Sequence, residues 1–428
     1  LILLASLFLL ITETGGYQQI QETKFRWFLL LCGGYIILMW ILVSQLSLIG
    51  AMKFSSPVSL LKKATPAQLC VVLYLLFTWV SALLSPCFPQ SIIGVSRYEG
   101  ALTITVYCMC FLLVSVYGRA TASLLYVFSA STLLLSGLCI IQLHGLNPLG
   151  LYPPGYSYMD AGNAYLGAYL GTVGNVDLLA AYYCLAIPIL WIALLRGTKR
   201  MRLFLLLPLL TSLYVACKMF VLAGLVGLVL GSAFSLPLLI NGTIRKKQIL
   251  AVLLALTALF CLSILYHFDI GDGFLHELHA VLRNRATDLF GSGRIRIWRL
   301  VWKRVPQHLW FGTGPDTMAN ANIEAFSRYD VTLEKTLTTF VDVAHNEYLN
   351  ILYHQGLLAL LSYLAFLVCI FAKWVRCSKD NVCAALGFAV LCYVIQACFG
   401  FSMCMAAPYF WTVAALLERK SLCNEKGV

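Results

Sequence analysis

A short basic stretch of this sequence has the residue types that could hold a phosphate group. Residues 291–293 (Gly-Ser-Gly) come before a run in which Arg294, Trp298 and Trp302 are spaced i, i+4, i+8. An amphipathic helix starting there would carry all three on one face. An arginine guanidinium offers phosphate oxygens a permanent charge and a planar fork of donors. A helix lying on a lipid surface would use the same residues at the headgroups, so both interpretations stay open at this point.

A second stretch, residues 342–350, could supply a proton acceptor. It places His345 just before an apolar run, where either Asp342 or Asn346 could cap a helix. The dipole at a helix N-terminus disfavours an imidazolium, so we expect His345 to be neutral and able to take up a proton. A histidine that only forms hydrogen bonds with its neighbours at a helix start would give the same pattern.

Two further polar positions interrupt apolar sequence. Asn175 and Asp177 stand where an apolar run begins, and they could orient a substrate or simply cap the helix. Lys218 divides residues 203–240, which favours two short helices over one bent helix. Its ammonium is a compact point charge rather than a fork.

The elements that must position these residues are membrane helices. Of the 428 residues, 61% are hydrophobic and only 11% are charged, against roughly 25% charged in a soluble domain. The net charge of +12 is explained by basic membrane loops, so no nucleic-acid partner is expected. The 16 cysteines are scattered without CxxC pairs, and no HExxH spacing occurs, so no metal or cofactor is expected.

The apolar runs predict about twelve transmembrane helices. Residues 1–11 are interpreted as part of a membrane helix that starts before Leu1, not as a signal peptide. The expected spans are 1–11, 27–44, 67–84, 100–116, 122–143, 175–195, 203–216, 219–240, 248–268, 347–371, 383–400 and 403–417.

Basic residues predict the orientation of these spans. With a cytoplasmic N-terminus, the inner connections receive the basic clusters at 62–63, 196–202 and 245–247, and the short outer loops hold only Lys24, Arg26, Arg97 and Lys218. Both termini are therefore expected in the cytoplasm. The chain divides into helices 1–9 (1–268), an extracytoplasmic loop with the Arg-Trp helix (269–346), and helices 10–12 with a short cytoplasmic tail (347–428).

In this order, the motifs resemble those of the O-antigen ligase and polymerase family, bacterial membrane glycosyltransferases that use lipid-linked glycans. Lys218 stands where an arginine is usual in that family. The resemblance rests on the Lys218 break and on three blocks: Gly174-Asn175-x-Asp177-x-x-Ala180-x-Tyr182 with Pro188; Gly293-Arg294-x-x-x-Trp298 with Pro306 and Gly312-x-Gly314; and Ala344-His345-Asn346-x-Tyr348-Leu349 with Gly356.

The resemblance implies an all-α integral membrane protein of GT-C-like type in the bacterial cytoplasmic (inner) membrane. The donor would be an undecaprenyl-diphosphate-linked glycan, and the acceptor a glycan, a lipid or a wall polymer. Transfer would be inverting and independent of metal. His345 would act as the base and Arg294 on the diphosphate. The resemblance and the polar positions suggest further binding roles for Arg296, Lys218, Asn175, Asp177, Asn346 and Trp298.

Alternatives to a ligase remain at the sequence level. A polymerase of the same family would share every motif. A transporter or lipid flippase would place ionisable residues near the middle of its spans, but spans 67–84, 100–116 and 122–143 contain none. A non-catalytic receptor or scaffold would explain neither the Arg-Trp run nor the His-Asn helix start.

Overall fold

The computed structural model describes residues 1–13, 15–48, 63–152, 158–160, 163–165, 171–240, 243–269, 274–285, 290–321, 323–330 and 335–425. Part of the basic connection used for orientation, residues 49–62, lies outside the described residues. The first half of the chain forms η1 (Leu4–Phe8), η2 (Gly16–Gln18), α1 (Ile20–Phe28), η3 (Leu29–Gly33), α2 (Gly34–Leu48), α4 (Pro66–Leu84), α5 (Gln90–Ile93), α6 (Ala101–Tyr117), α7 (Ala122–Leu143), β1 (Tyr158–Asp160), β2 (Asn163–Tyr165), α8 (Val176–Arg196) and α9 (Lys199–Met219). The second half forms α10 (Leu222–Leu239), α11 (Ile244–His267), α12 (Phe274–Leu282), α13 (Phe290–Trp302), η4 (Val305–His308), η5 (Met318–Ala321), β3 (Phe326–Asp330), β4 (Lys335–Thr339), α14 (Glu347–Cys377), α15 (Asn381–Gln396) and α16 (Ala407–Glu425).

Eight helices in the described part of the chain are long and apolar enough to cross a membrane, and α6 and α15 are shorter apolar helices. The chain is therefore a predominantly helical, multi-pass membrane protein, as expected. The structure is consistent with the expected all-α membrane protein, and two short antiparallel hairpins, β1–β2 and β3–β4, lie in the segments between helices. Residues 203–240 do form two helices, α9 and α10, separated at Phe220, whose φ is 49°.

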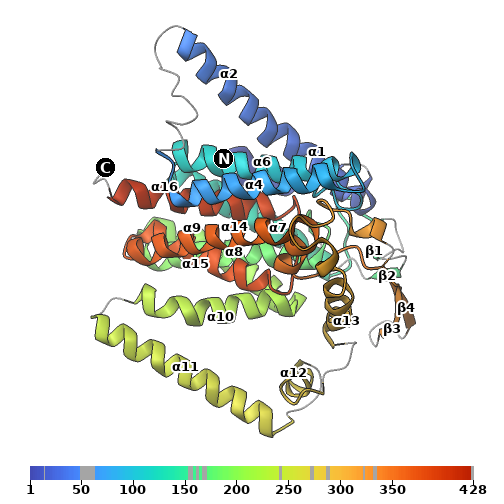
Figure 1. The fold of residues 1–428 in the computed structure, drawn as a ribbon. Coiled ribbons are helices and arrows are strands. Elements are labelled where there is room, and N and C mark those ends of the chain that lie inside the picture. The colour runs from blue at the N-terminus through green and yellow to red at the C-terminus, as the bar shows by residue number, and fades with distance from the viewer. Residues whose placement is uncertain are drawn as a thin grey trace.

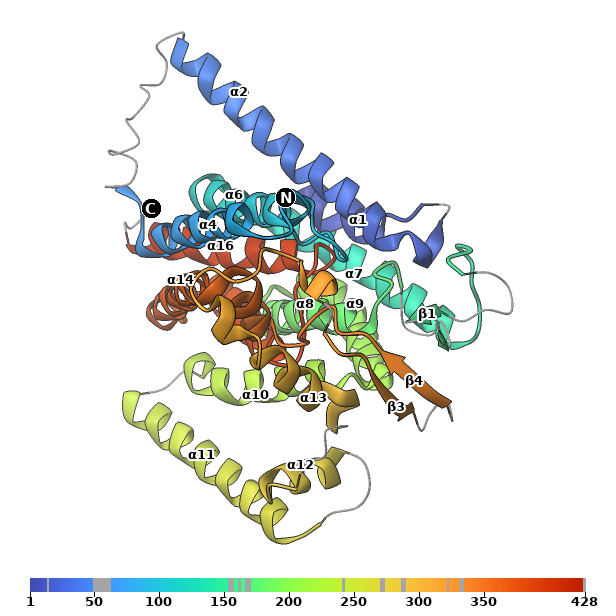
Figure 2. The ribbon, with the colours of Figure 1, turned by 45° about the vertical axis from the view of Figure 1, so that its right-hand side comes forward.

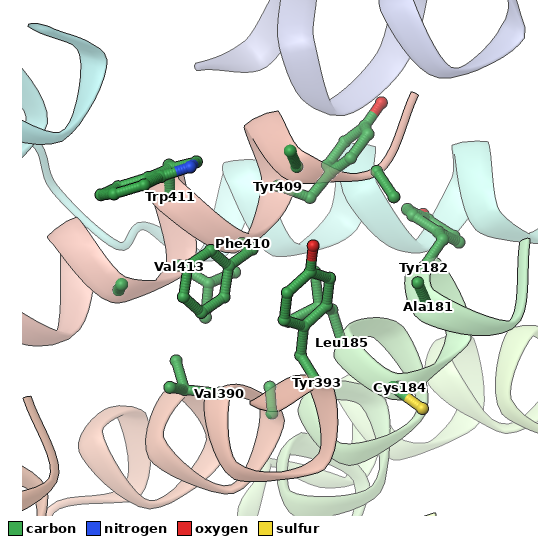
Figure 3. Close-up of a cluster of buried hydrophobic side chains, with 14 of the residues drawn as sticks. Ala181, Tyr182, Cys184, Leu185, Val390, Tyr393, Tyr409, Phe410, Trp411 and Val413 are labelled. Atoms are coloured by element: carbon green, nitrogen blue, oxygen red, sulfur yellow. The ribbon is translucent and has the colours of Figure 1, made fainter. Parts of the chain in front are cut away.

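The bundle is built around α8, whose membrane-length window is 72% buried. Helices α9, α10 and α15 pack directly against it. Aromatic side chains fill the space between α8, α15 and α16, where the rings of Tyr393 and Phe410 stack at 4.5 Å and those of Tyr182 and Tyr409 meet edge to face at 5.1 Å (Figure 3). Interlocked rings of this kind hold the helices in one register.

Two apolar helices lie apart from this bundle. Figures 1 and 2 show α2 and α11 diverging from it on opposite sides. No residue in the membrane-length window of α11 is buried, and α2 exposes large apolar side chains such as Trp40 and Leu38. Apolar surface of this extent is stable where hydrocarbon, rather than water, covers it.

The polar elements gather at one end of the bundle. Helix α13 and both hairpins lie there, whereas the start of α4 and the end of α16 lie at the opposite end (Figure 1). Within the long segment expected as a loop, the described residues from Ile297 to Phe326 form a small core with the start of α14, through Ile297, Val301, Val305, Met318 and Phe326. This part of the segment is therefore a folded cap on the bundle.

A break in α14 ties this cap to the bundle. Gly356 has φ 83° and ψ 179°, and a Cβ there would lie 2.2 Å from the carbonyl oxygen of Trp310. The carbonyls of Tyr353 and His354, which the break frees, accept the amide N–H groups of Thr313 and Gly314 at 3.0 and 2.8 Å. The Gly312-x-Gly314 turn and the break at Gly356 therefore pack closely against each other and join the cap to α14.

The short loop between α5 and α6 is fixed to the same cap. The Asp316 carboxylate accepts hydrogen bonds from the Ser96 hydroxyl at 3.0 Å and from the Arg97 amide at 2.8 Å. Glu99, at the end of this loop, is partly buried and accepts a hydrogen bond from the Tyr107 hydroxyl at 2.8 Å. Burial raises the pKa of the Glu99 carboxyl well above its usual range, the nearby Asp316 and Glu347 raise it further, and the Tyr107 hydrogen bond opposes the rise.

This burial makes the stability of the protein depend on pH. Because the folded pKa lies above the usual value of 4.5, the folded state keeps a proton that the unfolded state has released. The contribution is present below pH 4.5 and is lost as the pH rises toward the folded pKa, by up to about 1.4 kcal/mol per pH unit. We expect Glu99→Gln, which keeps a neutral acceptor for Tyr107, to flatten the fall of Tm as the pH rises above about 4.5. Parallel Tm profiles for the two proteins in detergent would contradict this.

Candidate active site

The start of α8 places an acid at the polar end of the bundle. The Asn175 side chain caps the helix, because its Oδ1 accepts the amides of Asp177 and Leu178 at 2.9 and 3.1 Å. Of the two roles considered for Asn175, capping is the one that the structure shows. Asp177 sits in the first turn with its carboxylate 19% exposed.

Helix α13 brings an arginine to this acid. The Arg294 guanidinium donates from Nη2 to Asp177 Oδ2 at 3.5 Å, and its side chain is 19% exposed. Gly293, just before it, has φ 88°, and a Cβ there would lie 2.9 Å from the Phe326 ring. Helix α13 begins at Phe290, so the Gly-Ser-Gly sequence lies inside its first turn rather than ahead of it. Ile297 anchors the helix in the cap's core.

The turn before α14 is fixed at Ala344. The Trp298 indole N–H donates to the Ala344 carbonyl at 2.8 Å, and the Ala344 amide donates to Asn350 Oδ1 at 3.3 Å. His345 follows with φ 48°, and Asn346 caps α14 by accepting the Leu349 amide at 3.0 Å. Of the two expected caps, Asn346 is therefore the correct one. Trp298 shapes the turn from within the protein, whereas Trp302 of the same helix is 59% exposed.

These three segments meet at one carboxylate. Asp177 Oδ2 lies 3.5 Å from Arg294 Nη2 and 4.0 Å from His345 Nδ1. The His345 side chain is 27% exposed, so a substrate can reach it. A guanidinium and an imidazole held side by side can bind an anionic leaving group and accept a proton. The carboxylate between them can favour the imidazolium that proton uptake would form.

Two other predicted residues are not brought to this carboxylate. The Arg296 guanidinium lies over the Phe326 ring, 4.8 Å from its centre. Lys218 is exposed in the last turn of α9 and, within the described residues, forms no ion pair with Asp177.

Sequence reasoning did not place three further residues, Arg97, Asp342 and Phe401, at this site, and it considered Asp342 only as a possible helix cap. The Arg97 fork donates to both oxygens of Asp342, from Nε at 2.9 Å and from Nη2 at 3.0 Å. The Cζ atom of the guanidinium lies 4.7 Å from the centre of the Phe401 ring. The centres of the Phe401 and His345 rings are 5.1 Å apart, and the two ring planes make an edge-to-face angle of 87°. The only signal in the sequence was an arginine in a short outer loop.

A small polar cavity lies behind the His345 turn. It measures about 50 Å³ and is lined by Arg97, Glu99, Asp316, Asp342 and Glu347, among others. Glu347 accepts a hydrogen bond from Tyr363 at 3.0 Å through Oε1, and within the described residues its buried Oε2 has no hydrogen-bond partner. The cavity is large enough for water, and its polar lining suits it.

The fold and this cluster define a multi-pass membrane protein with a polar site at one end of its bundle. Residues 178–364 match the family model described as O-antigen ligase, a range that starts one residue after Asp177 and includes Arg294 and His345. The match supports assignment of the chain to the O-antigen ligase family and confirms the resemblance predicted from the motifs. That family suggests a membrane enzyme of polysaccharide assembly with lipid-linked glycan substrates. Comparison with curated proteins gave no match.

Proposed function

We propose that this protein is a membrane glycosyltransferase of O-antigen ligase type. It transfers a glycan from an undecaprenyl-diphosphate carrier to an acceptor hydroxyl at the outer face of the bacterial cytoplasmic membrane. The observation that carries the proposal is the placement of Asp177 Oδ2 within 3.5 Å of Arg294 and 4.0 Å of His345. This contact joins three sequence motifs that lie far apart along the chain.

The position of the site supports an outward orientation. The cap and the Asp177 cluster lie at one end of the bundle, and the start of α4 and the end of α16 lie at the other (Figure 1). The basic clusters at 196–202 and 245–247 belong to short connections, which favours the cytoplasm for them. Both termini are then cytoplasmic and the site faces outward.

The reaction follows from the chemistry of these groups. As the acceptor oxygen attacks the anomeric carbon, its proton passes to the His345 imidazole and the new C–O bond forms. The bond from that carbon to the diphosphate breaks, and undecaprenyl diphosphate leaves with the electron pair. Direct displacement inverts the anomeric configuration. Arg294 offsets the charge that grows on the leaving diphosphate, and Asp177 stabilises the imidazolium.

The test is transfer by the purified protein. Wild type in detergent is given an undecaprenyl-diphosphate oligosaccharide with glycan, lipid or wall-polymer acceptors, and products are followed by mass spectrometry. One addition per acceptor is expected of a ligase, and a ladder of products would identify a polymerase of the same family. Movement of a labelled donor across proteoliposomes, with no transfer to any acceptor, would refute the enzyme proposal in favour of a flippase.

Arg294 takes the role that a metal ion could play at the diphosphate. We therefore expect metal chelation to have little effect on glycan transfer. We expect the transfer rate to change less than about twofold after EDTA treatment and dialysis, because Arg294 supplies the positive charge. The matched control is EDTA loaded with Ca²⁺, which separates chelation from ionic strength. A loss of activity that returns only with a divalent cation would contradict the metal-independent mechanism.

A further inference from the structure

We propose that Arg97 is a positioning residue that sets the orientation of the His345 imidazole through Asp342 and Phe401. This inference rests on the proposed function, in which His345 accepts the acceptor's proton. Arg97 and Phe401 lie outside the stretches that predicted the site, and Asp342 was considered there only as a possible helix cap. They come from the α5–α6 loop, the segment before α14 and the connection between α15 and α16.

The backbone at Arg97 is fixed by hydrogen bonds that do not involve the Arg97 side chain. Asp316 Oδ2 accepts the amides of Ser96 and Arg97 at 3.2 and 2.8 Å, and the Val95 amide donates to the Asp316 carbonyl at 3.0 Å. Asp316 is 5% exposed. A buried carboxylate with several donors fixes a loop firmly, because losing one bond leaves a charge poorly solvated.

From this loop the Arg97 side chain contacts Asp342, Phe401 and Met403, whose Sδ accepts from Nη1 at 3.7 Å. Its fork binds both oxygens of Asp342, at 2.9 and 3.0 Å, so the carboxylate can neither rotate nor tilt freely. Its flat face covers the Phe401 ring at 4.7 Å. With 18% of its side chain exposed, Arg97 is well packed at the site.

The contacts with Asp342 and Phe401 both reach His345. Asp342 is in the segment that leads into His345, and the Phe401 ring meets the imidazole edge to face at 5.1 Å and 87°. The edge-to-face contact limits rotation of the imidazole while Nδ1 lies 4.0 Å from Asp177. The fork of Arg97 is occupied by Asp342 and its face by Phe401, which favours positioning over direct binding of the diphosphate.

The expected signature is a loss of turnover without a loss of donor affinity. Misplacing a base by about 1 Å can cost on the order of 100-fold, so Arg97→Gln should lower kcat by about 10- to 100-fold. The KM for the donor should change less than about threefold, because the Arg294–Asp177 contact is untouched. Arg97→Lys keeps the charge but loses the fork, so it should also lower kcat, though by less.

A second variant tests the contact between the Phe401 ring and the same imidazole. Phe401→Leu removes the edge-to-face contact and leaves the Arg97–Asp342 pair in place, and should lower kcat in the same way. Phe401→Tyr keeps the ring and should retain most of the activity. Because Arg97 and Phe401 act on one side chain, the losses in the double variant Arg97→Gln/Phe401→Leu should be less than additive.

The deciding experiment measures the imidazole itself. Each folded variant is treated with diethyl pyrocarbonate, which acylates accessible neutral imidazoles, and modification of His345 is followed by mass spectrometry with exposed His308 as the internal control. We expect His345 to react at least about threefold faster in Arg97→Gln and in Phe401→Leu, with His308 unchanged. Because labelling does not depend on catalysis, it still tests this inference if wild type transfers no glycan, an outcome that would count against the proposed function alone.

Three results would overturn the inference. Unchanged His345 labelling in both variants would show that neither contact holds the imidazole. A raised donor KM with unchanged kcat in Arg97→Gln would make Arg97 a substrate ligand. If Arg97→Gln does not fold, Phe401→Leu decides alone, and wild-type kcat with wild-type labelling in that variant would exclude the proposed route.

Discussion

Replacing His345 with asparagine is expected to lower kcat by about 10²- to 10⁴-fold, the range that general acid–base catalysis contributes. Asparagine is the informative substitution because His345 has φ 48°, a conformation that asparagine tolerates and that costs alanine roughly 1 kcal/mol or more. His345→Asn should therefore keep the turn and remove only the proton acceptor. His345→Ala should be equally inactive and slightly less stable.

The matched control is His308→Ala, which replaces an exposed histidine in the same cap. Its transfer rate and Tm should both equal those of wild type. Single-turnover rates measured with bound donor would separate the chemical step from donor binding. A His345→Asn protein that folds and transfers glycan at the wild-type rate would refute the assignment of His345 as the base.

The core of the site could be predicted because its residues are tied to helix starts. Asn175 and Asn346 are helix caps, and a cap fixes which neighbouring residues face the end of the bundle. Asp177 and His345 lie within two residues of such caps, so their neighbourhood follows from local sequence rules. Arg294 follows from the helical spacing of its segment. Their contact with one another at Asp177 depends on the tertiary structure, which the order of the motifs only suggested.

The second half of the site could not be predicted, because no local rule links its members. Arg97 and Asp342 are 245 positions apart. Their pairing depends on Asp316 holding the α5–α6 loop against the cap. The Phe401 ring is placed by the connection between α15 and α16, where periodicity carries no information. The small core that α13, η4, η5 and β3 form between Ile297 and Phe326 could not be predicted for the same reason.

One helix boundary was predicted wrongly because the hydropathy pattern treats a buried charged residue as the end of a helix. The expected span 27–44 starts too late, because α1 begins at Ile20 and contains Lys24 and Arg26. Lys24 is 2% exposed and donates to the carbonyls of Phe8 and Leu9 at 2.7 and 3.0 Å. Arg26 pairs with Glu22 one turn away. Charges that are paired within the protein need not end a helix.

Replacing Arg294 is expected to have the other large effect. Arg294→Gln should lower kcat/KM for the diphosphate donor by about 10²- to 10³-fold, or roughly 2.7 to 4 kcal/mol of transition-state stabilisation. The guanidinium offsets charge that develops on the leaving group, and its contact with Asp177 Oδ2 at 3.5 Å holds it beside His345. Without it, the Asp177 carboxylate would also repel the donor. Arg294→Lys should recover only part of the rate, because an ammonium restores charge but not the fork.

The same substitution elsewhere on α13 provides the control. Arg299→Gln changes an exposed arginine of that helix and should leave kcat/KM within about twofold. The discriminating comparison is between donors, since a group that acts on the diphosphate should matter much less for a donor with a better leaving group than undecaprenyl diphosphate. If Arg294→Gln and Arg299→Gln have equal, small effects, Arg294 serves only to join α13 to α8. The charge on the leaving diphosphate must then be offset by a different cation, and Lys218 is the first to test.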